Sequence, residues 1–184
     1  MNINRKILSI GALLLIVGIM TAVMGYNPSQ ILQYIFIAIL LSIGVLGFVI
    51  GQQAKNNFLR SKYYTGIGFI LFALAISLGI WAATLGAFIN VLGFFLLVLG
   101  IVEFVFALQI LTTASPVPWG LLGVKLVISA VTATGAAWIL TMAEENTNVA
   151  LLFSAGLIVV IGLAFILLSR ITKTFEQAID AANN

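Results

Sequence analysis

The sequence predicts an all-α integral membrane protein with six transmembrane helices, and three observations lead to this fold class. The 184-residue chain is 62% hydrophobic and only 7% charged, whereas soluble domains are about 45–50% apolar and about 25% charged. Its apolar segments are continuous over roughly 20 residues, the length that a helix needs to cross a hydrocarbon core about 30 Å thick. A membrane β-barrel would instead show alternating segments of about ten residues.

Short polar breaks separate the six apolar segments, and together these segments form a single membrane domain over residues 1–184. Four of the five breaks contain a proline or a charged residue, whereas the third, residues 83–86, contains neither and is the weakest. We expect the helices at about residues 7–25, 31–51, 63–82, 87–111, 117–142 and 148–169.

The basic residues predict the orientation of the chain in the membrane. Cytoplasmic loops of membrane proteins are enriched in lysine and arginine. With a cytoplasmic N-terminus, seven of the eight basic residues lie on the inner side and the outer loops contain none: Arg5, Lys6, Lys55, Arg60, Lys62, Arg170 and Lys173. We therefore expect both termini in the cytoplasm. The first apolar segment follows basic residues like a signal peptide, but no small-residue cleavage site follows it, so we expect it to be a retained helix.

Aromatic residues agree with this orientation. Tryptophan and tyrosine collect at the two membrane interfaces, where an apolar ring with a polar group is half buried. We expect Tyr26, Trp81 and Trp138 near the outer interface, and Tyr63, Tyr64 and Trp119 near the inner one.

Small residues recur every seven positions and indicate three copies of one helical hairpin. In lipid, helices associate through close packing, so small residues line the contacts between them. The predicted packing residues are Gly11, Gly18, Gly68, Ala75, Gly123 and Ala130 in the odd helices, and Gly44, Gly51, Gly100, Ala107 and Gly162 in the even ones. Every copy starts and ends on the inner side, so the repeats are parallel. Alternating-access transporters often have inverted repeats instead.

Three tandem hairpins in a short chain resemble the HdeD-like family of bacterial inner-membrane proteins. The glycine-rich segments at residues 93–101 and 119–123 and the Tyr26-Asn27-Pro28 turn carry the likeness. The resemblance implies a multi-pass protein of the bacterial inner membrane, linked to envelope or acid stress or to assembly with a partner. It implies no catalytic residue.

Two charged residues fall well inside the predicted spans, Glu103 and Lys125. Charges at membrane depth are costly and indicate a functional site by default. Each residue lies eleven positions from Ala114, the centre of the predicted turn between the fourth and fifth helices, so an antiparallel hairpin places them at equal depth. The equivalent positions of the other repeats are uncharged. We therefore expect a Glu103–Lys125 ion pair that faces the bundle interior.

Three interpretations of this pair remain open. The pair can be a structural contact that sets the register of the hairpin. Alternatively, Lys125 extends to the inner headgroups and leaves Glu103 protonated. Third, the pair belongs to a proton or ion relay, in which Ser129 and Thr132 extend a polar track outward.

Residues 170–182 form a tail with two possible structures. Ile171, Phe175 and Ile179 recur every four residues, as in an amphipathic helix on the inner interface. The alternative is a frayed polar end.

Composition also limits the function classes. Histidine and cysteine are absent, which excludes thiol nucleophiles and histidine bases, and we expect no enzyme activity, cofactor or metal site. A net charge of +3 is too small to indicate a surface that binds nucleic acid. The expected partners are the lipid bilayer and a homo-oligomer or membrane-protein partner. We predict a non-enzymatic HdeD-like membrane protein; the alternative is a small-solute or proton channel or transporter that uses the Glu103/Lys125 pair.

Overall fold

The structure is a computed structural model of the chain. It describes residues 3–26, 29–55, 58–113 and 119–182, with the side chains of residues 58, 59, 113 and 171–182 excepted. Within this part of the chain every regular element is a helix. The predicted all-helical fold class is thus confirmed.

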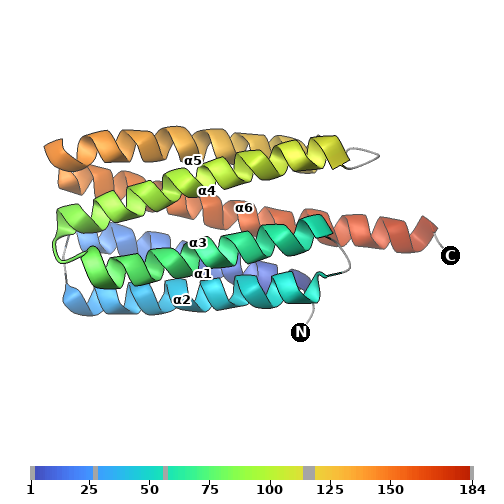
Figure 1. Ribbon diagram of the computed structural model, residues 1–184, viewed down its shortest axis with the longest axis horizontal. Coiled ribbons are helices and arrows are strands. Elements are labelled where there is room, and N and C mark those ends of the chain that lie inside the picture. Colours follow the sequence, from blue (N-terminus) through green and yellow to red (C-terminus); the bar gives the residue numbers. More distant parts are fainter. Residues whose placement is uncertain (1–2, 27–28, 56–57, 114–118, 183–184) are drawn as a thin grey trace.

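Six helices make up the described chain (Figure 1), and all six are long and apolar enough to cross a membrane. This confirms the predicted number of spans. The helices begin earlier or end later than expected at most boundaries, because polar residues at their ends continue the helical backbone. Their bounds are α1 Ile3–Tyr26, α2 Gln30–Gln53, α3 Phe58–Trp81, α4 Leu85–Thr113, α5 Trp119–Glu145 and α6 Thr147–Ala182.

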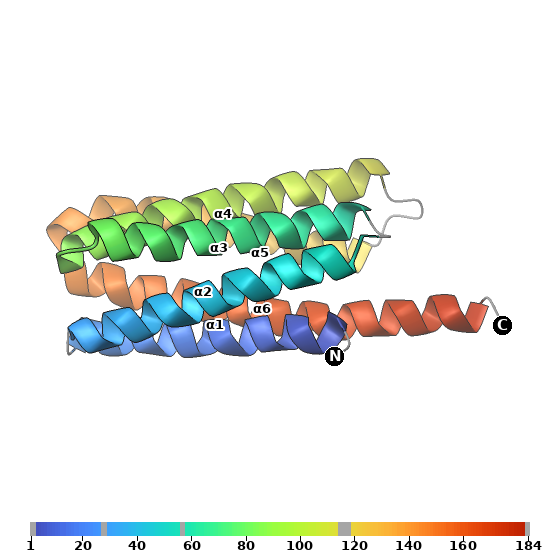
Figure 2. The same cartoon turned by 60° about the horizontal axis from the view of Figure 1, so that its bottom comes forward.

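The helices lie alongside one another in an elongated antiparallel bundle (Figures 1 and 2). One end, on the right in Figure 1, holds the N-terminus and the α2–α3 and α4–α5 connections, and α6 leaves the bundle there. The opposite end holds the other three connections. The most extensive contacts join α1 to α6, α2 to α3, and α4 to α5. Each even helix therefore packs mainly on the odd helix that follows it, and α6 returns to α1.

Glycine permits close approach of two of these helix pairs. A side chain at Gly11 of α1 would lie 2.8 Å from the backbone oxygen of Gly162 in α6. A side chain at Gly68 of α3 would lie 2.8 Å from the backbone oxygen of Gly44 in α2. Contacts this short exclude a methyl group unless the backbones separate, which is the role that small residues have in membrane helix packing. Gly18 and Gly51 lie in the same two interfaces.

Two predicted packing residues of α5, Gly123 and Ala130, do not lie on its buried face within the chain. A side chain at Gly123 would meet no atom within 4 Å, and Gly123 and Ala130 are both exposed in the isolated chain. The buried face of α5 contains Lys125 and Ser129 instead, and Gly100 of α4 approaches Ala133. Lys125 must face the bundle interior to avoid lipid, and this rotation turns the Gly123 side of α5 outward. Ala75 and Ala107 are fully buried, as expected of packing residues.

The tail continues α6, as one of the two predicted structures required. The backbone of α6 is helical without interruption to Ala182, so the segment is not a frayed end. In Figures 1 and 2 it extends past the bundle along the direction of α6.

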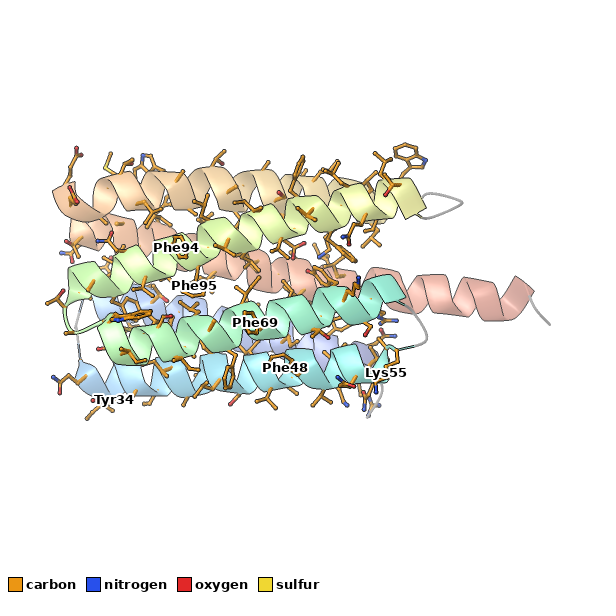
Figure 3. All side chains as sticks on the ribbon, in the orientation of Figure 1. Tyr34, Phe48, Lys55, Phe69, Phe94 and Phe95 are labelled. Atoms are coloured by element: carbon orange, nitrogen blue, oxygen red, sulfur yellow. The ribbon has the colours of Figure 1, made fainter. Side chains whose placement is uncertain are left out.

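The outer surface of the bundle is apolar, as contact with lipid requires. Phe69 of α3 is 65% exposed and Phe94 of α4 is 55% exposed, and Figure 3 shows both on the outside of their helices. Single exposed apolar residues are common in soluble proteins, but here they continue along every helix. Six such helices define a multi-pass integral membrane protein.

Candidate functional site

Glu103 of α4 and Lys125 of α5 form an ion pair inside the bundle. The Lys125 Nζ lies 2.7 Å from the Glu103 Oε2. Each residue is only 2% exposed. The structure thus brings together the two residues that the equal-depth argument placed opposite each other.

Tyr63 of α3 completes this cluster, which we call the buried triad (Tyr63, Glu103 and Lys125). The Tyr63 hydroxyl donates a hydrogen bond to Oε1 of Glu103 and accepts one from Nζ of Lys125. Both carboxylate oxygens of Glu103 therefore have a partner. Three helices contribute one residue each, so the triad connects α3 to the α4–α5 pair.

Aromatic rings surround the ammonium group of Lys125. Its Nζ lies 3.9 Å from the centroid of the Tyr63 ring, 5.6 Å from that of Phe106 and 5.7 Å from that of Phe165. Rings within about 6 Å attract a cation through their quadrupole. The Tyr63 and Phe106 rings also pack together, with centroids 4.2 Å apart. The charged groups are thus enclosed by apolar surface that keeps lipid and water away.

Close packing of α4 on α5 brings the two charges together. Gly100 lies one helical turn before Glu103, and a side chain there would come within 2.7 Å of the backbone nitrogen of Ala133. On α5, Ser129 donates a hydrogen bond of 2.8 Å to the backbone oxygen of Gly100. Ser129 lies one turn beyond Lys125 on the same face. A small residue and a hydroxyl together hold the helices at a distance where the two side chains can meet.

The geometry decides between some of the interpretations of the pair. A lysine that reached the headgroups would have an exposed ammonium group, whereas Lys125 is buried and bonded to Glu103. That interpretation is wrong. The polar track outward is short: Ser129 and Thr132 are both buried, but Ser129 bonds to the α4 backbone and Thr132 Oγ1 has no partner in the described part of the chain.

The sequence did not predict Tyr63 as a member of the triad. We expected it, with Tyr64, in the aromatic belt at the inner interface, but both residues are 5% exposed and lie in the core. The two rings pack edge to face with centroids 5.0 Å apart. Only its position along the helix could have indicated this contact. Tyr63 is five residues from the first residue of α3 and so lies near the level of Lys125 in the bundle.

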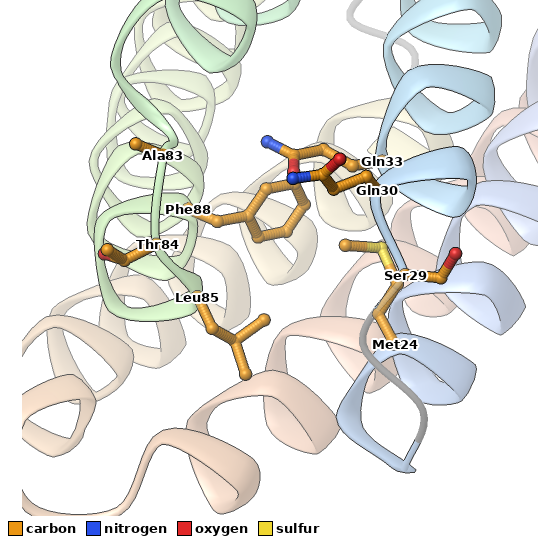
Figure 4. Close-up of a pocket in the computed structure, with 8 residues that line it drawn as sticks. All are labelled: Met24, Ser29, Gln30, Gln33, Ala83, Thr84, Leu85 and Phe88. Carbon is orange, nitrogen blue, oxygen red and sulfur yellow. The ribbon is translucent and has the colours of Figure 1, made fainter.

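A second polar region lies at the opposite end of the bundle. A pocket of about 150 Å³ is open to the surface there and lies between the start of α2 and the α3–α4 connection (Figure 4). Gln33 donates a hydrogen bond of 2.8 Å to the backbone oxygen of Ala82 at its edge. Phe88 lies at its base, and fifteen residues of α4, about 22 Å of helix, separate Phe88 from Glu103. None of the residues that line it belongs to the buried triad.

The triad combines a carboxylate, an ammonium and a phenol that are hydrogen-bonded to one another. The described residues contain no group of three or more acidic side chains that could hold a metal ion.

The fold and this site thus define a class, the multi-pass integral membrane protein with a buried ion pair. No family model, no curated protein and no solved structure matches the chain.

Proposed function

We propose that this chain is a non-enzymatic integral membrane protein of the HdeD-like type, located in the bacterial inner membrane. In this proposal it acts in envelope or acid stress, or in the assembly of a membrane partner. The buried triad serves the architecture, because it fixes α3, α4 and α5 relative to one another. Mutual satisfaction of its three polar groups is the observation that carries the proposal.

Burial of the triad favours a structural role over conduction. An ion or proton path needs polar groups that exchange partners or contact water. Here the ammonium and both carboxylate oxygens are engaged within the cluster, and aromatic rings close around it. A buried ion pair of this kind contributes specificity of packing, since misaligned helices would leave a charge without its partner.

The proposal includes three parallel hairpin repeats with both termini in the cytoplasm. It is supported by the packing order, in which α2 lies on α3, α4 on α5 and α6 on α1. A ring of three related hairpins produces this order, because the second helix of each copy meets the first helix of the next. The six basic residues described with their side chains at one end support the orientation.

A small-solute or proton channel or transporter is the second candidate. Thr132 favours it, since the residue is 1% exposed and its buried hydroxyl has no partner in the described residues. It lies two turns outward from Lys125 on the buried face of α5. A conducting state would use this face after Lys125 separates from Glu103.

Flux measurements in proteoliposomes between pH 4 and pH 7 distinguish the two functions. The substrates are protons, urea and acetate, and the proteins are the wild type, Glu103→Gln and the control Glu144→Gln, which changes an exposed acid at the other end of the bundle. The structural proposal expects no flux above that of protein-free vesicles with any protein. Selective uptake that Glu103→Gln abolishes and Glu144→Gln preserves would contradict it.

The stress role is tested in cells. Deletion of the gene is expected to lower survival after transfer to acid medium, and expression of the wild-type chain is expected to restore it. Unchanged survival and unchanged membrane-protein composition in the deletion strain would contradict both stress and assembly roles.

A further inference from the structure

The pocket at the end of the bundle opposite the N-terminus has an apolar part and a polar part. Its lining residues belong to α1, α2, α4 and the α3–α4 connection. The pocket has a volume of about 150 Å³, and a cavity of this volume can hold a molecule the size of benzene. The lining residues therefore indicate which small molecule would fit.

Phe88 and Met24 form the apolar part of the pocket, and both residues are buried. The ring of Phe88 packs edge to face on that of Phe36 in α2, with centroids 5.2 Å apart, so the ring is held in place. Aromatic rings pack favourably against other rings and against the sulfur of methionine. This part of the pocket therefore suits a small aromatic group.

Two glutamine side chains form the polar part. Nε2 of Gln33 donates its hydrogen bond to the backbone oxygen of Ala82, and a carbonyl oxygen only accepts, so this contact fixes which way the amide points. Oε1 of Gln33 is left without a hydrogen bond among the residues that the structure describes. Gln30, the first residue of α2, is exposed. Figure 4 shows both side chains extending from α2 toward the α3–α4 connection, beside the Phe88 ring.

Hydrogen bonds hold the walls of the pocket in position. The contact of Gln33 with Ala82 joins α2 to the end of α3. Thr84 begins α4, since its Oγ1 accepts a hydrogen bond of 3.2 Å from the backbone nitrogen of Ala87 and its backbone oxygen accepts one of 2.9 Å from that of Phe88. The pocket is thus formed before a ligand enters, and a preorganised site loses little free energy to ordering on binding.

The lining residues favour an uncharged ligand with a hydroxyl group. None of the described residues that line the pocket has a charged side chain. An ionised ligand would lose part of its hydration there without meeting an opposite charge. A hydroxyl group, in contrast, can donate a hydrogen bond to Oε1 of Gln33 and accept one from the amide nitrogen of Gln30.

The pocket lies where the spanning helices leave the hydrocarbon. Ser29 precedes α2, and residues 82–84 connect α3 to α4. Tyr26, Tyr34 and Trp81 lie near the same helix ends and are exposed. Aromatic rings that carry a polar group collect at this level of a bilayer. A ligand of that kind is therefore concentrated at the opening of the pocket.

We propose that this pocket binds a small, uncharged aromatic alcohol of the phenol class. Its ring packs on Phe88 and Met24, and its hydroxyl group donates a hydrogen bond to Oε1 of Gln33. The site is independent of the buried triad, which lies toward the other end of the bundle.

Fluorine NMR of the full chain in lipid nanodiscs tests the proposal. The lipid is phosphatidylcholine, whose headgroup has no hydroxyl group, and empty nanodiscs measure how much probe enters the lipid alone. The probes are 4-fluorophenol, fluorobenzene and ionised 4-fluorobenzoate. After correction for empty nanodiscs, 4-fluorophenol is expected to bind about fivefold more tightly than fluorobenzene, the effect of one hydrogen bond. The ionised probe is expected to bind no more tightly than fluorobenzene.

Gln33→Met removes the acceptor and keeps a side chain of similar length. It is expected to lower the affinity for 4-fluorophenol about fivefold and to change that for fluorobenzene less than about twofold. Gln109→Met is the matched control, since Gln109 is an exposed glutamine near the other end of α4. It is expected to change neither affinity. Equal losses of 4-fluorophenol binding in the two variants would overturn the proposal.

Measurements on the wild type alone can also overturn the proposal, so it remains testable if Gln33→Met fails to fold. A 4-fluorophenol signal equal to that with empty nanodiscs would show that no such site exists. Equal affinities for 4-fluorophenol and fluorobenzene would exclude a role for the hydroxyl group. Tighter binding of 4-fluorobenzoate than of 4-fluorophenol would contradict an uncharged ligand.

Discussion

The Nζ of Lys125 lies 2.7 Å from Oε2 of Glu103 across the α4–α5 interface, with both residues almost fully buried. In a bundle with an apolar exterior, this contact places two opposite charges where neither can reach water. Removal of one partner leaves an uncompensated charge, whereas removal of both leaves apolar surface. The pair therefore determines how α4 and α5 can pack but need not be a large source of stability.

Tyr63→Phe is expected to destabilise the protein by about 1–2 kcal/mol, because two hydrogen bonds to charged groups are lost while the ring packing is kept. Thermal unfolding in detergent, followed by tryptophan fluorescence, measures the effect. Tyr34→Phe is the control, since Tyr34 is 69% exposed. Equal midpoints for Tyr63→Phe and the wild type would show that the phenol contributes nothing to the triad.

Gly68→Ala and Gly123→Ala are expected to differ, although the repeat pattern makes the two glycines equivalent. A methyl group at Gly68 would lie 2.8 Å from the backbone oxygen of Gly44 and 2.9 Å from the backbone nitrogen of Phe48. Overpacking of this kind costs about 1–3 kcal/mol. At Gly123 the methyl group meets nothing, and the change should stay within about 0.5 kcal/mol. Unfolding midpoints of the two variants provide the comparison, and equal losses would contradict the packing described.

The orientation can be measured by labelling, because the natural chain contains no cysteine. Lys55→Cys and Glu145→Cys place one thiol at each end of the bundle, and both positions are exposed. A membrane-impermeant maleimide added to intact inner-membrane spheroplasts is expected to label Glu145→Cys. Lys55→Cys should react only after the membrane is permeabilised. The reverse pattern would place the termini outside and would contradict the positive-inside assignment.

The helices could be predicted because apolar length alone identifies a span, whereas their ends could not. Backbone groups must be hydrogen-bonded wherever lipid surrounds them. Helical structure therefore extends through polar residues such as Asn4 and Lys6, which the hydropathy pattern had placed outside α1.

The depth of a residue could be predicted better than the direction in which it points. Counting from the connection placed Glu103 and Lys125 at one level, and they meet. Tyr63 was assigned to the interface, because its position along α3 does not show which neighbouring helix its side chain faces. The same limit explains why Gly123 is exposed. Small residues recur every seven positions around Gly123 as they do around Gly68, but this spacing does not show which way α5 is rotated. The rotation of α5 follows from Lys125, a constraint that the small-residue pattern does not contain.

The stability of Lys125→Met against that of the double variant Lys125→Met/Glu103→Leu tests the structural role of the triad most directly. Both proteins are purified in the same detergent, and their unfolding midpoints and folded yields are compared with the wild type. The single change should cost about 3–5 kcal/mol, because it leaves Glu103 buried without its cation, and the double variant should recover most of that loss. A double variant as unstable as Lys125→Met, or less stable, would contradict the account.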